Sequence, residues 1–350
     1  MAWRATRASV AGLKEAVTIA GGGLAGLSLA AGLRGRDVPV AVYEAGAYPR
    51  HRVCGEFISG VEETTLEALG IAACLADARR HRRLAWLREG KPIYEGELPD
   101  PALGISRYRL DQRLRNRVVE LGGVVREQSR LPRTTREGLV WTTGRFPQRG
   151  GWIGLKCHFE DLPMIADLEM HLGENGYAGL AGIEDGRVNV CGLFRVDRSI
   201  RFKGPELLLT YLARGGNGAL VDRLRQARVD ATSCQAVAGF ELGRQPARDG
   251  ECVLGDAESM IAPFTGNGMS MAFQGAELAL DPLEDWSRGK LPWDTCVATI
   301  RDRLRVRFRR RLFSASLMQP VLLHRGGRRL IEYLSRSGLL PFHPLLSLVR

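Results

Sequence analysis

A cluster of glycines between two short apolar runs is the feature that most constrains how this chain folds. The apolar run Ala16–Ala20 enters the sequence Gly21-Gly22-Gly23-Leu24-Ala25-Gly26, and an Ala/Leu-rich stretch of helical character follows. Val38–Tyr43 then has the character of a second buried strand, with Glu44 directly after it. The order strand, glycine turn, helix, strand, acid is typical of a nucleotide-binding βαβ unit.

Each glycine of this motif has a physical task. We expect Gly21 to make the tight turn, Gly23 to let the backbone approach a pyrophosphate, and Gly26 to allow the helix to pack closely on the strand. The free N–H groups at the N-terminus of the helix would face the phosphates. Glu44 is placed to accept hydrogen bonds from an adenosine ribose. The motif therefore predicts dinucleotide binding, with a purely structural turn as the alternative.

Composition and charge narrow the class of protein. With 350 residues, 45% hydrophobic and 25% charged, the chain resembles an ordinary globular protein, which excludes disorder and fibrous repeats. The net charge of +11 is uneven, because residues 301–350 hold twelve arginines against two acids, Asp302 and Glu332. A basic tail on a nearly neutral body indicates an anionic surface or a solvated helix face. We therefore predict no nucleic-acid partner.

The cysteines and histidines give no metal signature. The seven cysteines are scattered without a C-x-x-C pair, so we expect reduced thiols in a cytoplasmic protein. The six histidines include no H-x-x-x-H or H-E-x-x-H spacing, and no metal site is predicted. No apolar run approaches the roughly 20 residues of a membrane-spanning helix. The start of the chain lacks the apolar core of a signal peptide.

A second motif lies in the last third of the chain. Gly255-Asp256-Ala257 follows a short strand, and Pro263-Phe264-Thr265-Gly266-Asn267-Gly268-Met269 precedes a helical stretch. Together the two motifs resemble the FAD-binding fold of the aromatic-hydroxylase (flavin monooxygenase) and geranylgeranyl-reductase flavoproteins. The resemblance implies that Asp256 binds the ribityl chain of FAD, and that Gly266, Asn267, Gly268 and Met269 face the pyrimidine edge of the flavin. A helix N-terminus there would stabilise negative charge on reduced flavin. An ordinary turn and helix cap is the alternative.

Two further segments extend the resemblance. The run from Arg50 to Glu56, with sequence RHRVCGE, is similar to the Cys-Gly segment of the reductases, which lies against the flavin. By this resemblance Arg52 contacts the cofactor, while Cys54 and Glu56 are candidate catalytic residues; for Cys54, inert packing is the alternative. The segment Ser106–Asp111 resembles the opening of an FAD-domain helix, and this resemblance implies that Arg107 lies near the cofactor. The alternative is a surface helix cap at Asp111.

Two departures from the family pattern affect the expected chemistry. Hydroxylases carry an Asp-Gly pair near the middle of the chain, whereas this chain has Thr143-Gly144, which weakens the case for direct NADPH use. The aromatic strand of the reductases and halogenases corresponds to Gly176–Gly182, which keeps Tyr177 but has no tryptophan. Tyr177 is the third candidate catalytic residue, and its small neighbours leave room for a bulky substrate. Electrons are expected from NAD(P)H that docks transiently or from a separate reductase.

The expected fold class is α/β, with two units and a helical tail. A Rossmann-like three-layer FAD-binding domain is expected from residues 12–80, 104–146 and 245–290. An inserted antiparallel β-sheet substrate domain is expected from residues 81–103 and 147–244, because four short strands with turns follow Gly151. Residues 291–350 form a basic helical C-terminal segment.

The resemblance implies an FAD-dependent oxidoreductase. The first expectation is a monooxygenase that hydroxylates a hydrophobic or aromatic small molecule through a flavin C4a-hydroperoxide. Reduction of a C=C bond in a hydrophobic substrate and a non-catalytic flavin-binding module are the alternatives. In the tail, an apolar row from Ile300 to Leu312 predicts a docked helix. The apolar end 339–346 would cover the substrate cavity or touch lipid, and contact of the basic segment with a membrane surface is an open alternative.

Overall fold

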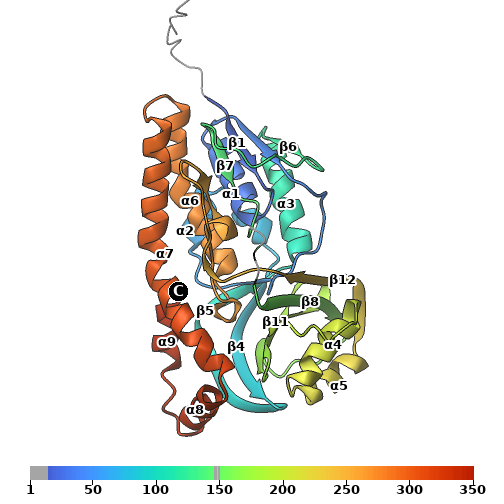
Figure 1. Ribbon diagram of the computed structural model, residues 1–350. Helices are drawn as coiled ribbons and strands as arrows, with labels where there is room; N and C mark the ends of the chain where they lie inside the picture. The colour runs from blue at the N-terminus through green and yellow to red at the C-terminus, as the bar shows by residue number, and fades with distance from the viewer. Residues whose placement is uncertain (1–14, 146–147, 149) are drawn as a thin grey trace, which may run out of the picture.

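The computed structural model describes residues 15–145, 148 and 150–350, and the expected domain boundaries at 12 and 146–147 lie outside these residues. Two sheets organise the described chain (Figure 1). The first is a five-stranded parallel sheet in the order β14-β7-β1-β2-β6. Its strands, in that order, are Cys252–Val253, Leu139–Trp141, Val17–Ala20, Val40–Tyr43 and Val124–Arg126.

Helices cover one face of the parallel sheet. Alternate strand residues such as Val17 and Ile19 face a large apolar core that they share with these helices. The helices that contribute to this core are α1 (Leu24–Gly35), α2 (Glu63–Ala68), α3 (Arg107–Glu120), α6 (Gly268–Ser287) and α7 (Trp293–Leu323). On the other face, Leu139 and Trp141 pack with Leu131, from residues 127–138, which form no helix or strand. The third layer of the expected arrangement is thus an irregular run of chain.

The second sheet has eight strands in the order β12-β8-β11-β10-β9-β4-β5-β3. These strands, in that order, are Arg228–Ala238, Trp152–Glu160, Val188–Arg195, Gly176–Gly182, Leu168–Leu172, Arg79–Arg88, Lys91–Gly104 and Phe57–Ile58. The strands expected after Gly151 are β8 to β11, and they pair in antiparallel fashion. However, β4 pairs with β9 in parallel, so the sheet is mixed and not antiparallel as expected. The two strands come from distant segments, and no hairpin fixes their relative direction.

One expectation about the cysteines was wrong. Cys157 on β8 and Cys234 on β12 form a disulfide between neighbouring strands. The partners are 77 residues apart in sequence, so only the pairing of β8 with β12 reveals them. Two helices, α4 (Gly204–Arg214) and α5 (Gly218–Gln226), cover this part of the sheet and bury its apolar face.

The C-terminal helices run along one side of both sheets (Figure 1). The apolar row of α7 is buried at Ile300, Leu304 and Phe308, so the predicted docked helix is confirmed. Two further helices follow, α8 (Arg325–Arg336) and α9 (Phe342–Leu348). Among the described residues, no helix is long and apolar enough to cross a membrane. A small two-stranded antiparallel sheet, β13 (Gly243–Arg244) with β15 (Ser259–Met260), lies in the segment between β12 and α6.

Substitution of Gly26 tests the close packing of α1 on β1. A Cβ atom at this position would lie 2.1 Å from the Gly21 carbonyl oxygen and 2.5 Å from Thr142 Oγ1. We expect Gly26→Ala to lower the free energy of unfolding by about 1–3 kcal/mol in urea titrations, because backbone atoms must shift. Gly35→Ala, at the end of the same helix, meets no atom within 4 Å and should cause no loss of stability. Equal stability of the two variants would contradict the close approach.

Candidate active site

One large cavity, of about 1920 Å³, receives side chains from both sheets. Its wall includes the turn before α1, the segment 49–55, the start of α6, several strands of the second sheet and the C-terminal residues of the chain. The sequence-predicted residues that line it are Gly21, Gly23, Glu44, Arg52, Cys54, Arg107, Tyr177, Asp256, Gly266, Gly268 and Met269. Gly26, Glu56 and Asn267 lie behind the wall.

The glycine turn leaves an open cradle in front of α1. Gly21 has a φ of +108°, and a Cβ there would lie 2.5 Å from the Thr142 carbonyl oxygen, so a side chain is excluded. At Gly23, by contrast, a Cβ would point into open space and meet only Arg107 Nη2, at 3.8 Å. Because α1 begins at Leu24, its free N–H groups open onto this space. The cradle therefore fits a phosphate group.

Glu44 lies at the end of β2, where its carboxylate is already surrounded by donors. It accepts hydrogen bonds from the backbone N–H of Gly22 at 2.8 Å and of Gly46 at 2.9 Å, and from Arg50 at 2.8 Å and Arg52 at 3.3 Å. Burial raises the pKa of Glu44, but Arg52, Gly46 and Arg50 together hold it below its ordinary value. Since a carboxylate has about four acceptor positions, any ligand hydroxyl that bound Glu44 would have to replace one of these donors.

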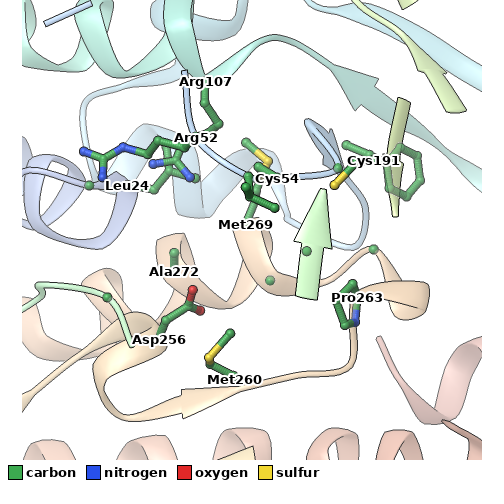
Figure 2. A pocket seen from close by; sticks show the side chains of 18 of the residues that line it. Leu24, Arg52, Cys54, Arg107, Cys191, Asp256, Met260, Pro263, Met269 and Ala272 are labelled. Carbon is green, nitrogen blue, oxygen red and sulfur yellow. The ribbon is translucent and has the colours of Figure 1, made fainter. Parts of the chain in front are cut away.

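Asp256 is an acid of the cavity wall without a hydrogen-bond partner among the described residues. It lies in the short 3₁₀ helix Gly255–Ala257, and its side chain is exposed to the cavity (Figure 2). Among the described residues, no side chain or backbone N–H donates a hydrogen bond to its carboxylate, although Arg107 and Arg145 contribute electrostatically. Burial raises the pKa of Asp256 above its ordinary value, and both arginines oppose the shift. The carboxylate is therefore free to accept hydrogen bonds from a ligand.

The N-terminus of α6 opens onto the same cavity. Gly266 precedes it with a φ of +66°, and a Cβ there would lie 2.4 Å from the ring of Phe57. Gly268 and Met269, the first residues of α6, line the cavity, and Figure 2 shows Met269 near Cys54. Asn267 is buried and donates from its side chain to the Thr265 carbonyl oxygen at 2.8 Å. Its position indicates that it shapes the turn.

Two arginines and a thiol form the wall beside α3. Asp111, which is fully buried, binds both Arg52 Nε at 2.8 Å and Arg107 Nε at 2.7 Å. This carboxylate holds the two guanidinium groups at the cavity next to Cys54 (Figure 2). Burial raises the pKa of the Cys54 thiol, which Arg107 only partly opposes. At neutral pH, Cys54 therefore keeps its proton.

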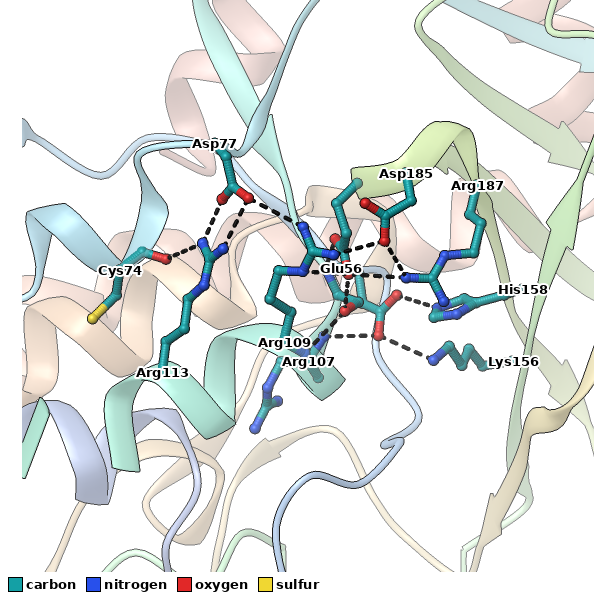
Figure 3. A network of polar contacts seen from close by, with 12 residues as sticks. Glu56, Cys74, Asp77, Arg107, Arg109, Arg113, Lys156, His158, Asp185 and Arg187 are labelled. Carbon is teal, nitrogen blue, oxygen red and sulfur yellow. Dashed lines mark hydrogen bonds and ion pairs between the residues drawn. The ribbon is translucent and has the colours of Figure 1, made fainter. Parts of the chain in front are cut away.

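Glu56 anchors a buried polar network behind Cys54 (Figure 3). Its carboxylate accepts hydrogen bonds from Lys156 Nζ at 3.0 Å, from His158 Nε2 at 2.6 Å and from the backbone N–H of Arg107 at 2.9 Å. The side chains of Glu56, Lys156 and His158 are completely buried. Glu56 also has a φ of 53°, a left-handed conformation that is uncommon for a residue with a side chain. The three contacts of the carboxylate hold this strained position in place.

His51 connects the buried network to the cavity. It lines the cavity, stacks on the ring of Tyr108 and lies with Nδ1 3.3 Å from Lys156 Nζ. Burial lowers the pKa of His51 to about 4, and the charges of Lys156 and His158 add to the effect. The imidazole is therefore neutral at neutral pH. A chain of polar groups thus runs from the cavity through His51 and Lys156 to Glu56.

Lys156 and His158 are residues that the sequence analysis did not assign to the site. They lie two residues apart on β8, so their side chains point to the same face of the sheet. The available signal was a lysine and a histidine in alternation within an otherwise apolar strand. Glu169 is a further omission: it lines the cavity while bound to His171 at 2.8 Å.

The far end of the cavity is apolar. Tyr177 lines it and accepts a hydrogen bond from the backbone N–H of Phe264 at 3.2 Å, with the two rings edge to face. The C-terminal side chains that line this end are Met318, Leu340, Phe342, Leu345, Leu346 and Val349. They face apolar lining residues of the second sheet, such as Leu84 and Trp86. The expectation that residues 339–346 cover the cavity is confirmed.

The fold is shared with several solved flavin-dependent enzymes. No protein-family model and no curated protein sequence matches this chain. HpxO from Klebsiella pneumoniae, complexed with FAD and uric acid, is 15% identical, with a TM-score of 0.76 over 98% of each chain. The p-nitrophenol 4-monooxygenase PnpA from Pseudomonas putida is 16% identical, with a TM-score of 0.73 over 95% of this chain and 98% of its own. The flavin-dependent brominase Bmp2 is 17% identical, with a TM-score of 0.74 over 96% of this chain and 93% of its own.

Identities of this size show the fold alone. The chain has the fold of these enzymes, and the expected α/β fold class is confirmed.

Glu56→Gln tests the buried network through stability. The variant leaves the Lys156 ammonium in the interior without a carboxylate, and we expect the free energy of unfolding at pH 7 to fall by about 3–5 kcal/mol. Glu120→Gln is the control, because Glu120 pairs with Arg117 on the surface at 3.5 Å. The control should cost at most about 1 kcal/mol.

The pH dependence of the same variant has a defined sign. Burial raises the pKa of Glu56, but the His158 hydrogen bond and the Lys156 charge hold it below its ordinary value. The stabilisation is therefore present above the unfolded-state pKa of about 4.3 and is lost as pH falls through the folded-state pKa. In urea titrations, the stability difference between wild type and Glu56→Gln should shrink below about pH 4. A difference independent of pH would contradict an ionised Glu56.

Proposed function

We propose that this protein is an FAD-dependent monooxygenase that hydroxylates a hydrophobic or aromatic small molecule. One observation carries the proposal: a single cavity joins the phosphate cradle at Gly23, the unpartnered Asp256 and the N-terminus of α6 to an apolar chamber. HpxO, which shares the fold, is complexed with FAD. FAD, when bound, would supply the two-electron redox chemistry and the reaction with O₂.

The residues of the cavity fit the parts of FAD in order. Gly23 and the N–H groups of α1 would hold the pyrophosphate. Glu44 would accept hydrogen bonds from the adenosine ribose after Arg50, the more exposed of its two arginines, swings away. Asp256 would accept hydrogen bonds from the ribityl hydroxyls. The N-terminus of α6 would face the flavin ring, where its partial positive charge stabilises added negative charge.

The chain's own contribution to the reaction is positioning and the exclusion of water. Tyr177 and Phe264 form one side of the apolar chamber, and Phe342 and Leu346 form another. Such walls keep water from the reacting atoms and orient a flat or elongated substrate. Glu56 does not line the cavity, so it would act through Lys156 and then His51, which does line the cavity. In this proposal, Glu56 is a positioning residue.

The electron donor and the cellular location belong to the same proposal. NAD(P)H or a separate reductase would deliver electrons, because the sequence holds one complete glycine motif, which the FAD site uses. A cytoplasmic location is part of the proposal; it rests on the five free cysteines, and the Cys157–Cys234 disulfide speaks against it. We keep the expected domain ranges as part of the proposal: the parallel-sheet unit would hold most of FAD, and the eight-stranded sheet would hold the substrate.

Reduction of a C=C bond is the second candidate function. The protonated thiol of Cys54 at the cavity favours it, because a reductase must donate a proton after hydride transfer. The two reactions differ in their need for oxygen. Hydroxylation incorporates one oxygen atom from O₂, whereas reduction adds two hydrogen atoms and proceeds without O₂.

The deciding experiment uses the holoprotein and a chemical supply of electrons. The protein is reconstituted with FAD, photoreduced, and mixed with a panel of phenols and with geranylgeraniol, in ¹⁸O₂ or under argon. Hydroxylation predicts a product that carries ¹⁸O and forms only with O₂. A product two mass units heavier than the substrate under argon would establish the reductase. A flavin that neither photoreduction nor any donor can reduce would indicate a non-catalytic module.

Asp256→Ala tests the assignment of the ribityl site. Loss of a hydrogen-bonded charge costs about 1.5–3 kcal/mol, so the Kd for FAD should rise roughly tenfold to a hundredfold. Asp249→Ala, an exposed acid in the preceding turn, is the matched control and should bind FAD as the wild type does. Flavin fluorescence titration of the apoprotein measures both affinities. Unchanged affinity in Asp256→Ala would remove Asp256 from the cofactor site.

A further inference from the structure

Bulky apolar side chains gather on the outer surface of the C-terminal helices. Of the thirteen exposed large hydrophobic residues in the described chain, seven fall between residues 306 and 339. These are Val306, Phe313, Leu317, Val321, Leu330, Tyr333 and Leu339. Single exposed apolar residues are ordinary, but such a concentration in one short stretch marks an interaction surface.

On α7 the exposed apolar residues form a row opposite the docked one. Val306, Phe313, Leu317 and Val321 are spaced by seven, four and four residues, which places them on one face of a helix. Ile300, Leu304 and Phe308 occupy the buried face. Figure 1 shows α7 along the edge of the molecule, so its outer face is turned away from both sheets. The outer row is therefore not needed for packing the helix.

The same surface carries a strong positive charge. Twelve arginines and two acids lie between Arg301 and Arg350. Several of these arginines are exposed and make no ion pair or hydrogen bond with any described residue: Arg305, Arg307, Arg309, Arg310, Arg325 and Arg329. A second copy of the chain would bring the same charge and be repelled. An anionic lipid bilayer accepts both the arginines and the apolar side chains.

This face lies one helix away from the apolar end of the cavity. Leu317 is exposed on α7, whereas its neighbour Met318 lines the cavity. Leu339 is exposed, whereas Leu340 lines the cavity at the start of the segment that leads into α9. The helical wall that closes the chamber is thus also the wall that carries the exposed row.

We infer that the outer face of α7 and α8, together with Leu339 just after α8, docks on the surface of an anionic phospholipid bilayer. This surface is defined by the seven exposed apolar residues and the exposed arginines named above. Docking places the apolar end of the cavity beside the lipid phase. That the cavity then receives a lipid-soluble substrate rests on the proposed function, whereas the docking itself does not.

The test is co-sedimentation of the full chain with vesicles of phosphatidylcholine alone or with added phosphatidylglycerol. We expect binding to the anionic vesicles that weakens as salt is raised, and little binding to the neutral ones. Arg309→Gln with Arg310→Gln should weaken binding to anionic vesicles about fivefold per arginine, since each is worth about 1 kcal/mol. Absence of binding to anionic vesicles at low salt, or equal binding to both kinds, would overturn the inference.

The apolar row is tested separately. Phe313→Ser with Leu317→Ser should weaken vesicle binding at least tenfold, because both side chains leave the lipid interface. Val196→Ser with Phe202→Ser is the matched control, since it removes two exposed apolar residues elsewhere and should bind as the wild type does. An equal loss of vesicle binding in the two double variants would overturn the assignment of the docking surface to this face. A dimer in sedimentation equilibrium that Phe313→Ser with Leu317→Ser dissociates would instead assign the face to a second copy.

The flavin content of each sample separates this inference from the proposed function. Vesicle binding depends on the outer face of α7 and α8, whereas FAD occupancy depends on the cavity. Variants of the outer row should keep the FAD affinity and thermal midpoint of the wild type. Normal FAD binding without vesicle binding would contradict the docking inference but leave the proposed function standing. Vesicle binding without flavin binding would contradict the proposed function but leave the docking inference standing.

Discussion

The architecture depends on one buried carboxylate. Glu56 belongs to the segment that follows the parallel-sheet strand β2, yet its side chain binds Lys156 and His158 of β8 in the second sheet. It also accepts the backbone N–H of Arg107 at the start of α3. An isolated buried charge costs several kcal/mol, so these contacts must form together. The backbone N–H of Glu56 donates to Cys54 Sγ at 3.4 Å, which ties Cys54 to the same residue.

A second carboxylate joins the two sheet units nearby. Glu184, after β10, accepts a hydrogen bond from the backbone N–H of Ser106 at 2.8 Å and is buried with it. Ser106 in turn caps α3, where its side chain accepts the N–H of Arg109. Both carboxylates therefore converge on the start of α3, from which Arg107 reaches the cavity. Buried carboxylates thus join the two sheet units at the wall of the cavity, beside the apolar contacts made there by residues such as Tyr177 and Phe264.

The sequence revealed the local parts of the site better than the assembled ones. The turn at Gly21–Gly26 could be predicted, because the spacing of glycines, strand and acid is contained in one βαβ unit. Asp256 could be placed only through a family resemblance. Lys156 could not be found, since its partner Glu56 is 100 residues away and a strand pattern does not show which strand faces which loop. The disulfide of Cys157 and Cys234 was missed for the same reason.

The two faces of α7 obey different physical requirements. The inner row, with Ile300 and Phe308, is fully buried and supplies the helix with its packing free energy. The outer row contributes nothing to that packing, and exposed side chains such as Phe313 lower solubility. A helix needed only as a cover would carry polar residues there. Because Met318 lines the cavity beside the exposed Leu317, apolar side chains continue from the chamber through the helix to its outer surface, as a contact with lipid requires.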